Sequence, residues 1–236
     1  MATPLRIPKS PRSSRSASGR QAAKPSRTIG RIRNPKTLRR IVAAAERIFA
    51  EQGVDGARTD GIARAAGVNK ALLYYYFESK EDLHRFTLET LLGEIREQVQ
   101  AGMKKSLSPR ERLVSFVNGY FDFMAAHPTY SRLVQREVMG RGESLRWIVR
   151  VYFGPLYRQL AATIRAGIQS GQFRRVDPQH TTVTLLGTTI FYFGAAPVLG
   201  EMWSCDPLSP ARLAARKRSV LDFVEHGLFR KAARAQ

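Results

Sequence analysis

Residues 59–83 read TDGIARAAGVNKALLYYYFESKEDL, and this stretch decides the fold. Ile62 and Ala63 belong to a short predicted helix, and Gly67 follows Ala63 by four residues. A small residue lets two helices cross closely, and a glycine permits a tight left-handed turn between them. A second short helix is expected to begin near Asn69. The spacing predicts two short helices joined by a turn, which is the helix-turn-helix unit.

The start of the second short helix carries the candidate binding residues. In a helix-turn-helix, this start enters the major groove of DNA. The side chains there are Asn69, Lys70, Ala71 and Leu72. Asparagine pairs with adenine, lysine with guanine, and an apolar side chain with the thymine methyl group. Lys80 lies at the start of the next helix, where a phosphate is favoured. We therefore expect these residues to contact double-stranded DNA.

Three consecutive tyrosines, Tyr74, Tyr75 and Tyr76, follow the start of that helix. Their hydroxyl groups are placed to reach phosphates. The alternative is core packing, because residues three or four apart share one face of a helix. We expect Tyr75 and Tyr76 to be exposed and Tyr74 to be partly buried, with Leu73 and Phe77 in the interior.

Further helix starts are marked by five pairs of a residue and a proline. Proline is tolerated at the first helical position, because its missing N–H would have no partner there. The pairs are Asn34-Pro35, Ser108-Pro109, His127-Pro128, Asp177-Pro178 and Ser209-Pro210, and all but His127 are good caps. Helical apolar spacing follows, including a long helix over residues 145–164 that we expect to bend at Pro155. No convincing strand pattern occurs, so the predicted fold is all-α.

The net charge of the chain is +20, from 39 Lys and Arg against 19 Asp and Glu. Such a charge favours a polyanionic partner, although a generally basic protein would show the same total. Residues 1–33 hold nine basic residues and no acidic one, among many Ser, Pro, Ala and Gly. This composition predicts a disordered basic arm. A transit peptide is similar in composition, but four prolines interrupt the amphipathic helix that it would need.

The cysteine count, the spacing of the histidines and the missing catalytic motifs limit which other functions the chain can have. Cys205 is the single cysteine, which excludes an internal disulfide, and the four histidines show no metal-ligand spacing. We therefore expect no metal and no cofactor. The chain lacks Gly-x-Ser-x-Gly, His-Glu-x-x-His and Gly-rich phosphate-loop motifs, so we do not expect an enzyme. It shows no secretion pattern, and we expect a reducing, cytoplasmic location.

Residues 181–200 carry no charge. This length could just span a bilayer, but threonines and glycines dilute its hydrophobicity. We favour a helix buried in protein or in a dimer interface, with no membrane partner. A second apolar stripe lies within residues 209–230. We expect a homodimer built on both helices, with candidate interface residues Leu185, Ile190, Leu213, Val220, Leu221 and Val224.

The quoted stretch resembles the TetR family of bacterial repressors. The family pattern runs Ile-Ala, Ala-Gly-Val, a short polar start, Leu-Tyr, Phe, Lys and Leu. In this chain the matching positions are Ile62-Ala63, Ala66-Gly67-Val68, Asn69-Lys70, Leu73-Tyr74, Phe77, Lys80 and Leu83. The resemblance covers residues 35–83 by motif. It implies a three-helix DNA-binding domain over residues 34–80 and a helical ligand-binding and dimerisation domain over residues 81–236.

By position, the resemblance implies DNA contacts at Thr59, Asn69, Lys70, Ala71, Tyr74, Tyr75, Tyr76 and Lys80. It also implies a ligand-responsive repressor that binds a palindromic operator as a homodimer with a four-helix interface. Three departures from the family pattern occur. Arg58 stands where a capping Ser or Thr is usual, Gly61 weakens its helix by about 1 kcal/mol relative to alanine, and Tyr76 replaces a common histidine.

Aromatic residues between positions 113 and 203 suggest a ligand cavity. The candidates are Phe116, Tyr120, Phe123, Trp147, Tyr152 and Phe191. The alternative is core packing, which is usual for aromatics at helical spacing. The family layout favours a small, largely apolar or aromatic effector, with the helix from Ser79 onward as the lever between the domains. A nonspecific nucleic-acid or membrane-surface binder is the remaining alternative.

Overall fold

The computed structural model describes residues 34–140 and 143–230. Within these ranges the chain forms eleven α-helices and one π-helix. The only β pairing in these ranges is an isolated bridge between Phe173 and Phe229. The elements are α1 (Pro35–Gly56), α2 (Thr59–Ala65), α3 (Lys70–Tyr76), α4 (Lys80–Gly102), α5 (Pro109–Ala126), α6 (Tyr130–Met139), α7 (Glu143–Ile148), η2 (Val149–Phe153), α8 (Gly154–Gln169), α9 (Pro178–Gly194), α10 (Ala196–Trp203) and α11 (Pro210–Leu228). The all-α prediction is confirmed. The predicted basic arm, residues 1–33, lies outside the described residues.

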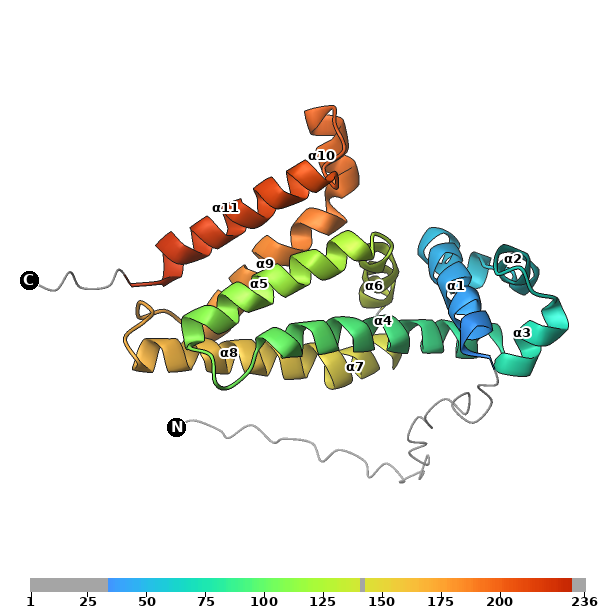
Figure 1. The fold of residues 1–236 in the computed structure, drawn as a ribbon, viewed down its shortest axis with the longest axis horizontal. Coiled ribbons are helices and arrows are strands. Elements are labelled where there is room, and N and C mark those ends of the chain that lie inside the picture. Colours follow the sequence, from blue (N-terminus) through green and yellow to red (C-terminus); the bar gives the residue numbers. More distant parts are fainter. Residues whose placement is uncertain (1–33, 141–142, 231–236) are drawn as a thin grey trace, which may run out of the picture.

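The molecule is elongated, with α1, α2 and α3 at one end and α5 to α11 in the body (Figure 1). Helix α4 runs from the three-helix end into the body and packs against both α1 and α5. One long helix therefore connects the two parts mechanically.

Capping side chains begin several helices as predicted. The Asn34 side chain accepts hydrogen bonds from the backbone of Lys36 and Thr37, and the capping box of Ser108 with Glu111 is complete. The prediction at His127-Pro128 is wrong, because these residues form a turn in which the His127 carbonyl accepts from the backbone of Tyr130. Helix α6 begins only at Tyr130.

The long helix predicted over residues 145–164 contains a π-helical segment, η2, which ends two residues before Pro155. Proline lacks an N–H and crowds the carbonyl four residues earlier, which disrupts α-helical pairing. Here the backbone N–H of Gly154 bonds to the carbonyl of Val149, five residues back, and the wider turns of η2 precede the proline. Helix α8 then begins at Gly154.

Buried apolar side chains form one core that continues from the three-helix end into the body.

None of the described helices is by itself long and apolar enough to span a membrane. Helices α9 and α10 reach that length and hydrophobicity only together, as a pair bent by 66°.

Candidate nucleic-acid interface and ligand cavity

The turn between α2 and α3 has the geometry that the sequence predicts. Gly67 adopts φ +63°, a left-handed conformation that favours glycine. The backbone N–H of Val68 donates to the Ala63 carbonyl at 2.9 Å, and Arg40 of α1 donates to the Gly67 carbonyl at 2.9 Å. A Cβ atom on Gly67 would lie 2.3 Å from an Arg40 nitrogen. The positive φ is what favours glycine at position 67, since the far end of the Arg40 side chain can shift.

Asn69 caps α3 and is only partly free to read a base. Its side-chain oxygen accepts a hydrogen bond from the backbone of Leu72 at 2.7 Å. Pairing with adenine through two hydrogen bonds requires that oxygen as well as the amide N–H group. While the cap is in place, the Asn69 side chain is left as a hydrogen-bond donor. At the start of α2, where Arg58 stands in place of the usual Ser or Thr, the side chain makes no cap.

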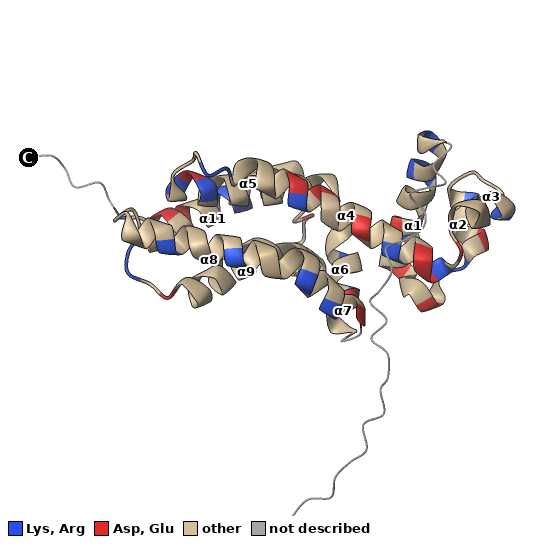
Figure 2. Ribbon diagram, turned by 90° about the horizontal axis from the view of Figure 1, so that it is seen from below, with Lys and Arg blue, Asp and Glu red and all other residues tan. Residues whose placement is uncertain are grey.

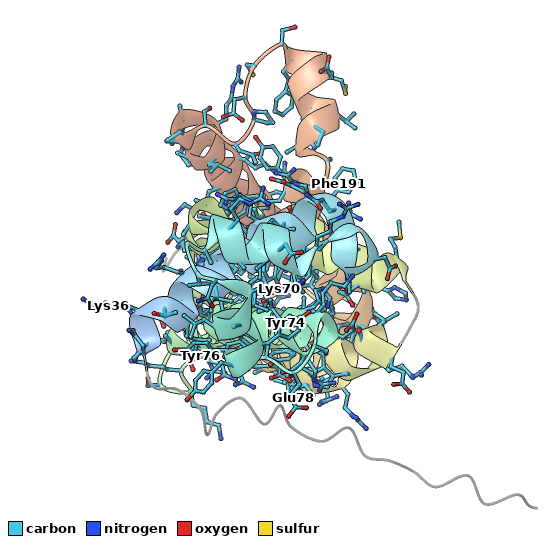
Figure 3. The ribbon with its side chains drawn as sticks, turned by 90° about the vertical axis from the view of Figure 1, so that its right-hand side faces the viewer. Lys36, Lys70, Tyr74, Tyr76, Glu78 and Phe191 are labelled. Atoms are coloured by element: carbon cyan, nitrogen blue, oxygen red, sulfur yellow. The ribbon has the colours of Figure 1, made fainter. Side chains whose placement is uncertain are left out.

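The exposed polar residues of α2 and α3 lie together at one end of the molecule. The Lys70 ammonium is 2.9 Å from a carboxylate oxygen of Asp60, and the pKa of Lys70 is raised, first by its hydrogen bond to Asp60. The hydroxyl groups of Thr59 and Tyr74 lie 3.4 Å apart. Viewed end-on, Lys70 and Tyr74 occupy the middle of this end (Figure 3). Because the ion pair is exposed, the Lys70 amine stays available to an external anion.

The exposure of the three consecutive tyrosines differs from the prediction. Tyr74 and Tyr75 are 44% and 40% exposed, whereas Tyr76 is only 4% exposed. The expectation that Tyr76 faces solvent is wrong, because it lies three residues after Leu73 on the inward face of α3. Its hydroxyl donates to the Asn34 carbonyl at 3.5 Å. Tyr76 therefore holds α3 against the start of α1.

Other predicted contacts vary in their access to solvent. Ala71 is exposed, and Leu72 is half-buried against the core. Lys80 is half-buried and donates to the Asp55 carbonyl at 3.3 Å, which ties the start of α4 to the end of α1. Sequence reasoning missed Lys36, which is exposed and lies at the edge of the same end (Figure 3). The Asn34-Pro35 helix start was the signal, since it places Lys36 in the first turn of α1.

A cavity of about 570 Å³ lies among α4, α5, α6, η2, α8 and α9. Among the candidate ligand-binding residues, Tyr120 and Tyr152 line it. Phe116 and Phe123 pack elsewhere in the core, and Trp147 packs against Tyr152 at 5.4 Å between ring centroids without lining the cavity.

Two aromatic residues differ from the predicted lining of the cavity. Phe191 is 71% exposed, so its placement in the cavity is corrected: it lies on the outer face of α9. Tyr130, at the first position of α6, lines the cavity and was missed. Among the described residues, no group of three or more His, Cys, Asp or Glu side chains could hold a metal ion.

Two protein-family models match the sequence of this chain. Residues 41–85 match the model of bacterial regulatory proteins of the tetR family, and residues 109–224 match the tetracyclin repressor-like C-terminal domain. The chain belongs to the TetR family. It is accordingly a helix-turn-helix transcriptional regulator, and neither model describes an enzyme.

Named relatives agree with this membership. The HTH-type transcriptional repressor NicS of Pseudomonas putida is 30% identical over 161 residues, which cover 67% of this chain and 75% of NicS. The regulator BetI of Rhizobium meliloti is 34% identical over 134 residues, covering 56% of this chain and 66% of BetI. The solved structure of FadR from Bacillus subtilis in complex with stearoyl-CoA shares the fold, with a TM-score of 0.63 and 23% identity over 79% of this chain and 96% of that one.

The predicted dimer residues of this TetR-family chain mostly face its own core. Leu185, Val220 and Val224 are buried within the subunit, so they do not lie on an accessible surface. The stripe chosen from the sequence is the face by which α9 and α11 pack against α5. Leu213 and Leu221 are half-buried, and Ile190 lines the cavity. The large apolar side chains that α9, α10 and α11 do expose are Val183, Ile190, Phe191, Val198, Met202, Trp203 and Phe223.

Helix α6 lies between the cavity and the DNA-binding end. The Arg136 guanidinium donates to the carbonyls of Ala50 and Glu51 at 3.3 and 2.8 Å, and the Thr129 hydroxyl donates to the Glu46 carboxylate. These bonds hold α6 against the second half of α1.

His84 of α4 is buried at the same junction. The side chain is 7% exposed, its ring packs edge-on to Phe49 at 4.8 Å, and its Nε2 lies 3.4 Å from Glu137. Burial lowers the pKa of His84 to about 4 and raises the pKa of Glu137. The junction of α1, α4 and α6 therefore contains a neutral imidazole near neutral pH.

Proposed function

We propose that this TetR-family regulator is a repressor that binds a palindromic operator as a homodimer and releases it when a small molecule enters the cavity. The single observation that carries the proposal is the position of α6, which lines the cavity with one face and bonds to α1 with another. The same fold thus places a binding cavity one helix away from the DNA-reading end. Its site of action is the bacterial cytoplasm, where its operator lies.

In the proposed complex, α3 lies in the major groove. Lys70 and Tyr75 are exposed on α3, and Ala71, the residue after Lys70, is exposed as well. We assign Lys70 to a base or phosphate, Ala71 to an apolar base edge, and Tyr75 to a phosphate. Lys36 is added as a phosphate contact from the start of α1. We assign the paired hydroxyl groups of Thr59 and Tyr74 to the sugar-phosphate backbone of the DNA near the start of α2.

The proposed dimer uses the outer faces of α9, α10 and α11. Phe191 is 71% exposed and Phe223 is 57% exposed, and large apolar side chains in such number indicate an interaction surface. One recognition helix reads few base pairs, so useful specificity requires two copies on two half-sites. The family resemblance, which implies a four-helix interface, supports the same helices with a different set of contact residues.

The proposed coupling runs through α6 as well as α4. The side chains of Tyr130, Val134 and Val138 line the cavity, and Arg136 of the same helix bonds to the end of α1. A ligand that prefers a displaced α6 therefore shifts α1, and with it the spacing of the two recognition helices. Only such a difference in affinity between two conformations can release DNA. Linkage requires that operator DNA weaken ligand binding by the same factor.

The DNA-binding part of this proposal is tested by selecting bound duplexes from a random pool with the full chain. The expected result is an inverted repeat that the protein prefers over bulk DNA by orders of magnitude. A pool that stays unenriched would show a nonspecific binder and contradict the proposal.

The coupling is tested with Arg136→Met, which keeps the aliphatic stem and removes the bonds to α1. Arg132→Met is the matched control, because Arg132 is exposed on the same helix and makes no bond to the described residues. In Arg136→Met we expect ligand and DNA each to bind, with a smaller effect of one on the other. Unchanged mutual inhibition in this variant would exclude α6 as the connection.

A further inference from the structure

Two tyrosine hydroxyl groups in the cavity have no hydrogen-bond partner among residues 34–140 and 143–230. Tyr120 and Tyr130 are 3% and 4% exposed, and both line the cavity. Neither hydroxyl makes a hydrogen bond to any of the described residues. Their rings are held by aromatic neighbours, with Tyr130 edge-on to Phe123 at 5.1 Å and Tyr120 against Phe116 at 6.0 Å between centroids. Neither oxygen is among the fully buried side-chain atoms that lack a partner, so both hydroxyl groups reach the space of the cavity, where an occupant can bind them.

Both hydroxyl groups act as hydrogen-bond donors at any physiological pH. Burial raises the pKa of Tyr120 and of Tyr130, so the phenols keep their protons. A protonated phenol can also accept through its oxygen, but its O–H donor is used only by an occupant that presents an oxygen or another acceptor in the interior of the cavity.

Most of the cavity wall is apolar. Leu92, Ile95 and Val99 of α4 face Val134 of α6 and Leu186 of α9 across it. A volume of about 570 Å³ lies within the range of small-molecule sites. The body of the occupant is accordingly a carbon skeleton, because a polar body would lose its hydration without compensation.

The rim of the cavity is cationic. Arg96 of α4 and Arg158 of α8 line the cavity and are exposed, which places them at its opening. No Asp or Glu is among the lining residues, and neither arginine forms an ion pair with the described residues. Helix α8 carries basic but no acidic residues (Figure 2). The Arg96 guanidinium lies 5.4 Å from the Tyr152 ring, which holds it beside the opening.

We propose that the effector is an amphipathic organic anion. Its carbon skeleton fills the apolar cavity, an oxygen on that skeleton accepts hydrogen bonds from Tyr120 and Tyr130, and its anionic group binds Arg96 and Arg158 at the rim. This assignment rests on the proposed ligand-responsive function and names the class of ligand that the site takes.

The test uses four probes of one chain length: dodecanoate, ω-hydroxydodecanoate, dodecanol and dodecyltrimethylammonium. Binding to the full chain is followed by calorimetry, with intrinsic tryptophan fluorescence as the second readout, because Trp147, one of the two tryptophans, packs on Tyr152 of the cavity wall. We expect both anions to bind at least tenfold more tightly than dodecanol, and the cation to bind most weakly. A cation that binds as tightly as dodecanoate, or no binding by any probe, would overturn the assignment.

Variants then locate the two ends of the ligand. The double variant Arg96→Gln, Arg158→Gln is expected to bind dodecanoate at least tenfold more weakly and dodecanol unchanged. Arg165→Gln is the matched control, since Arg165 is exposed on α8 but does not line the cavity. Tyr120→Phe with Tyr130→Phe should abolish any preference for the hydroxylated anion, with an unchanged melting temperature as the check on folding. Equal dodecanoate affinity in the arginine variant and the control would reject the rim site. Release of operator DNA by a neutral or cationic metabolite would reject the ligand class and leave the ligand-responsive function standing.

Discussion

Protonation of His84 should destabilise the junction of α1, α4 and α6 at mildly acidic pH. The ordinary pKa of histidine is 6.5, and burial lowers that of His84 to about 4. Between these values the unfolded chain binds a proton that the folded chain does not, so the free energy of unfolding falls as the pH falls through this window. Each unit of difference is worth 1.36 kcal/mol, which gives about 3 kcal/mol over the whole window and about 2 kcal/mol by pH 5.

The assay is urea unfolding of the full chain and of His84→Gln at pH 7.5 and at pH 5. The glutamine side chain does not titrate but can still donate to Glu137, which lies 3.4 Å from His84. Carboxylates titrate in both proteins, so the difference between them isolates His84. We expect the wild-type protein to lose about 2 kcal/mol more than the variant on acidification. If both proteins lose the same free energy, the reasoning from burial of His84 is refuted.

Three further predictions concern DNA binding and assembly. Lys70→Ala should lower operator affinity by about ten- to a hundredfold without changing the melting temperature, and Tyr75→Phe should lower operator affinity less. If gel-shift titration shows unchanged affinity for both variants, α3 does not bind in the major groove. Deletion of residues 1–31 should weaken DNA binding and flatten its salt dependence, since released counterions scale with neutralised phosphates; an identical salt slope would show that the arm does not contact DNA. Phe223→Glu, at a side chain that is 57% exposed, should give monomers by sedimentation, whereas a dimer of normal stability would place the interface elsewhere.

The helix-turn-helix could be predicted because its determinants are local. The left-handed turn at Gly67 and the cap at Asn69 each depend on residues within a few positions in the sequence, and both occur in the structure. The same holds for the capping box at Ser108. Such features need no knowledge of which distant segments meet.

Features that depend on distant packing were assigned less well. Tyr76 is buried because α1 begins beside it, and Phe191 is exposed because α9 turns its other face to the core. Apolar periodicity identifies a stripe but does not say whether it faces the subunit core or a partner, which is why Val220 and Val224 were assigned to the interface. Aromatic content likewise indicated a cavity without distinguishing Tyr130 from Phe116.

The most direct test of a dimer reading a palindrome is the affinity for a selected operator in which one half-site has been scrambled. Fluorescence anisotropy with the full chain measures the intact operator, the half-scrambled duplex and bulk DNA at one salt concentration. We expect scrambling of one half-site to lower affinity by orders of magnitude, nearly to that of bulk DNA, because one recognition helix reads too few base pairs. Equal affinity for the intact and the half-scrambled duplex would contradict it.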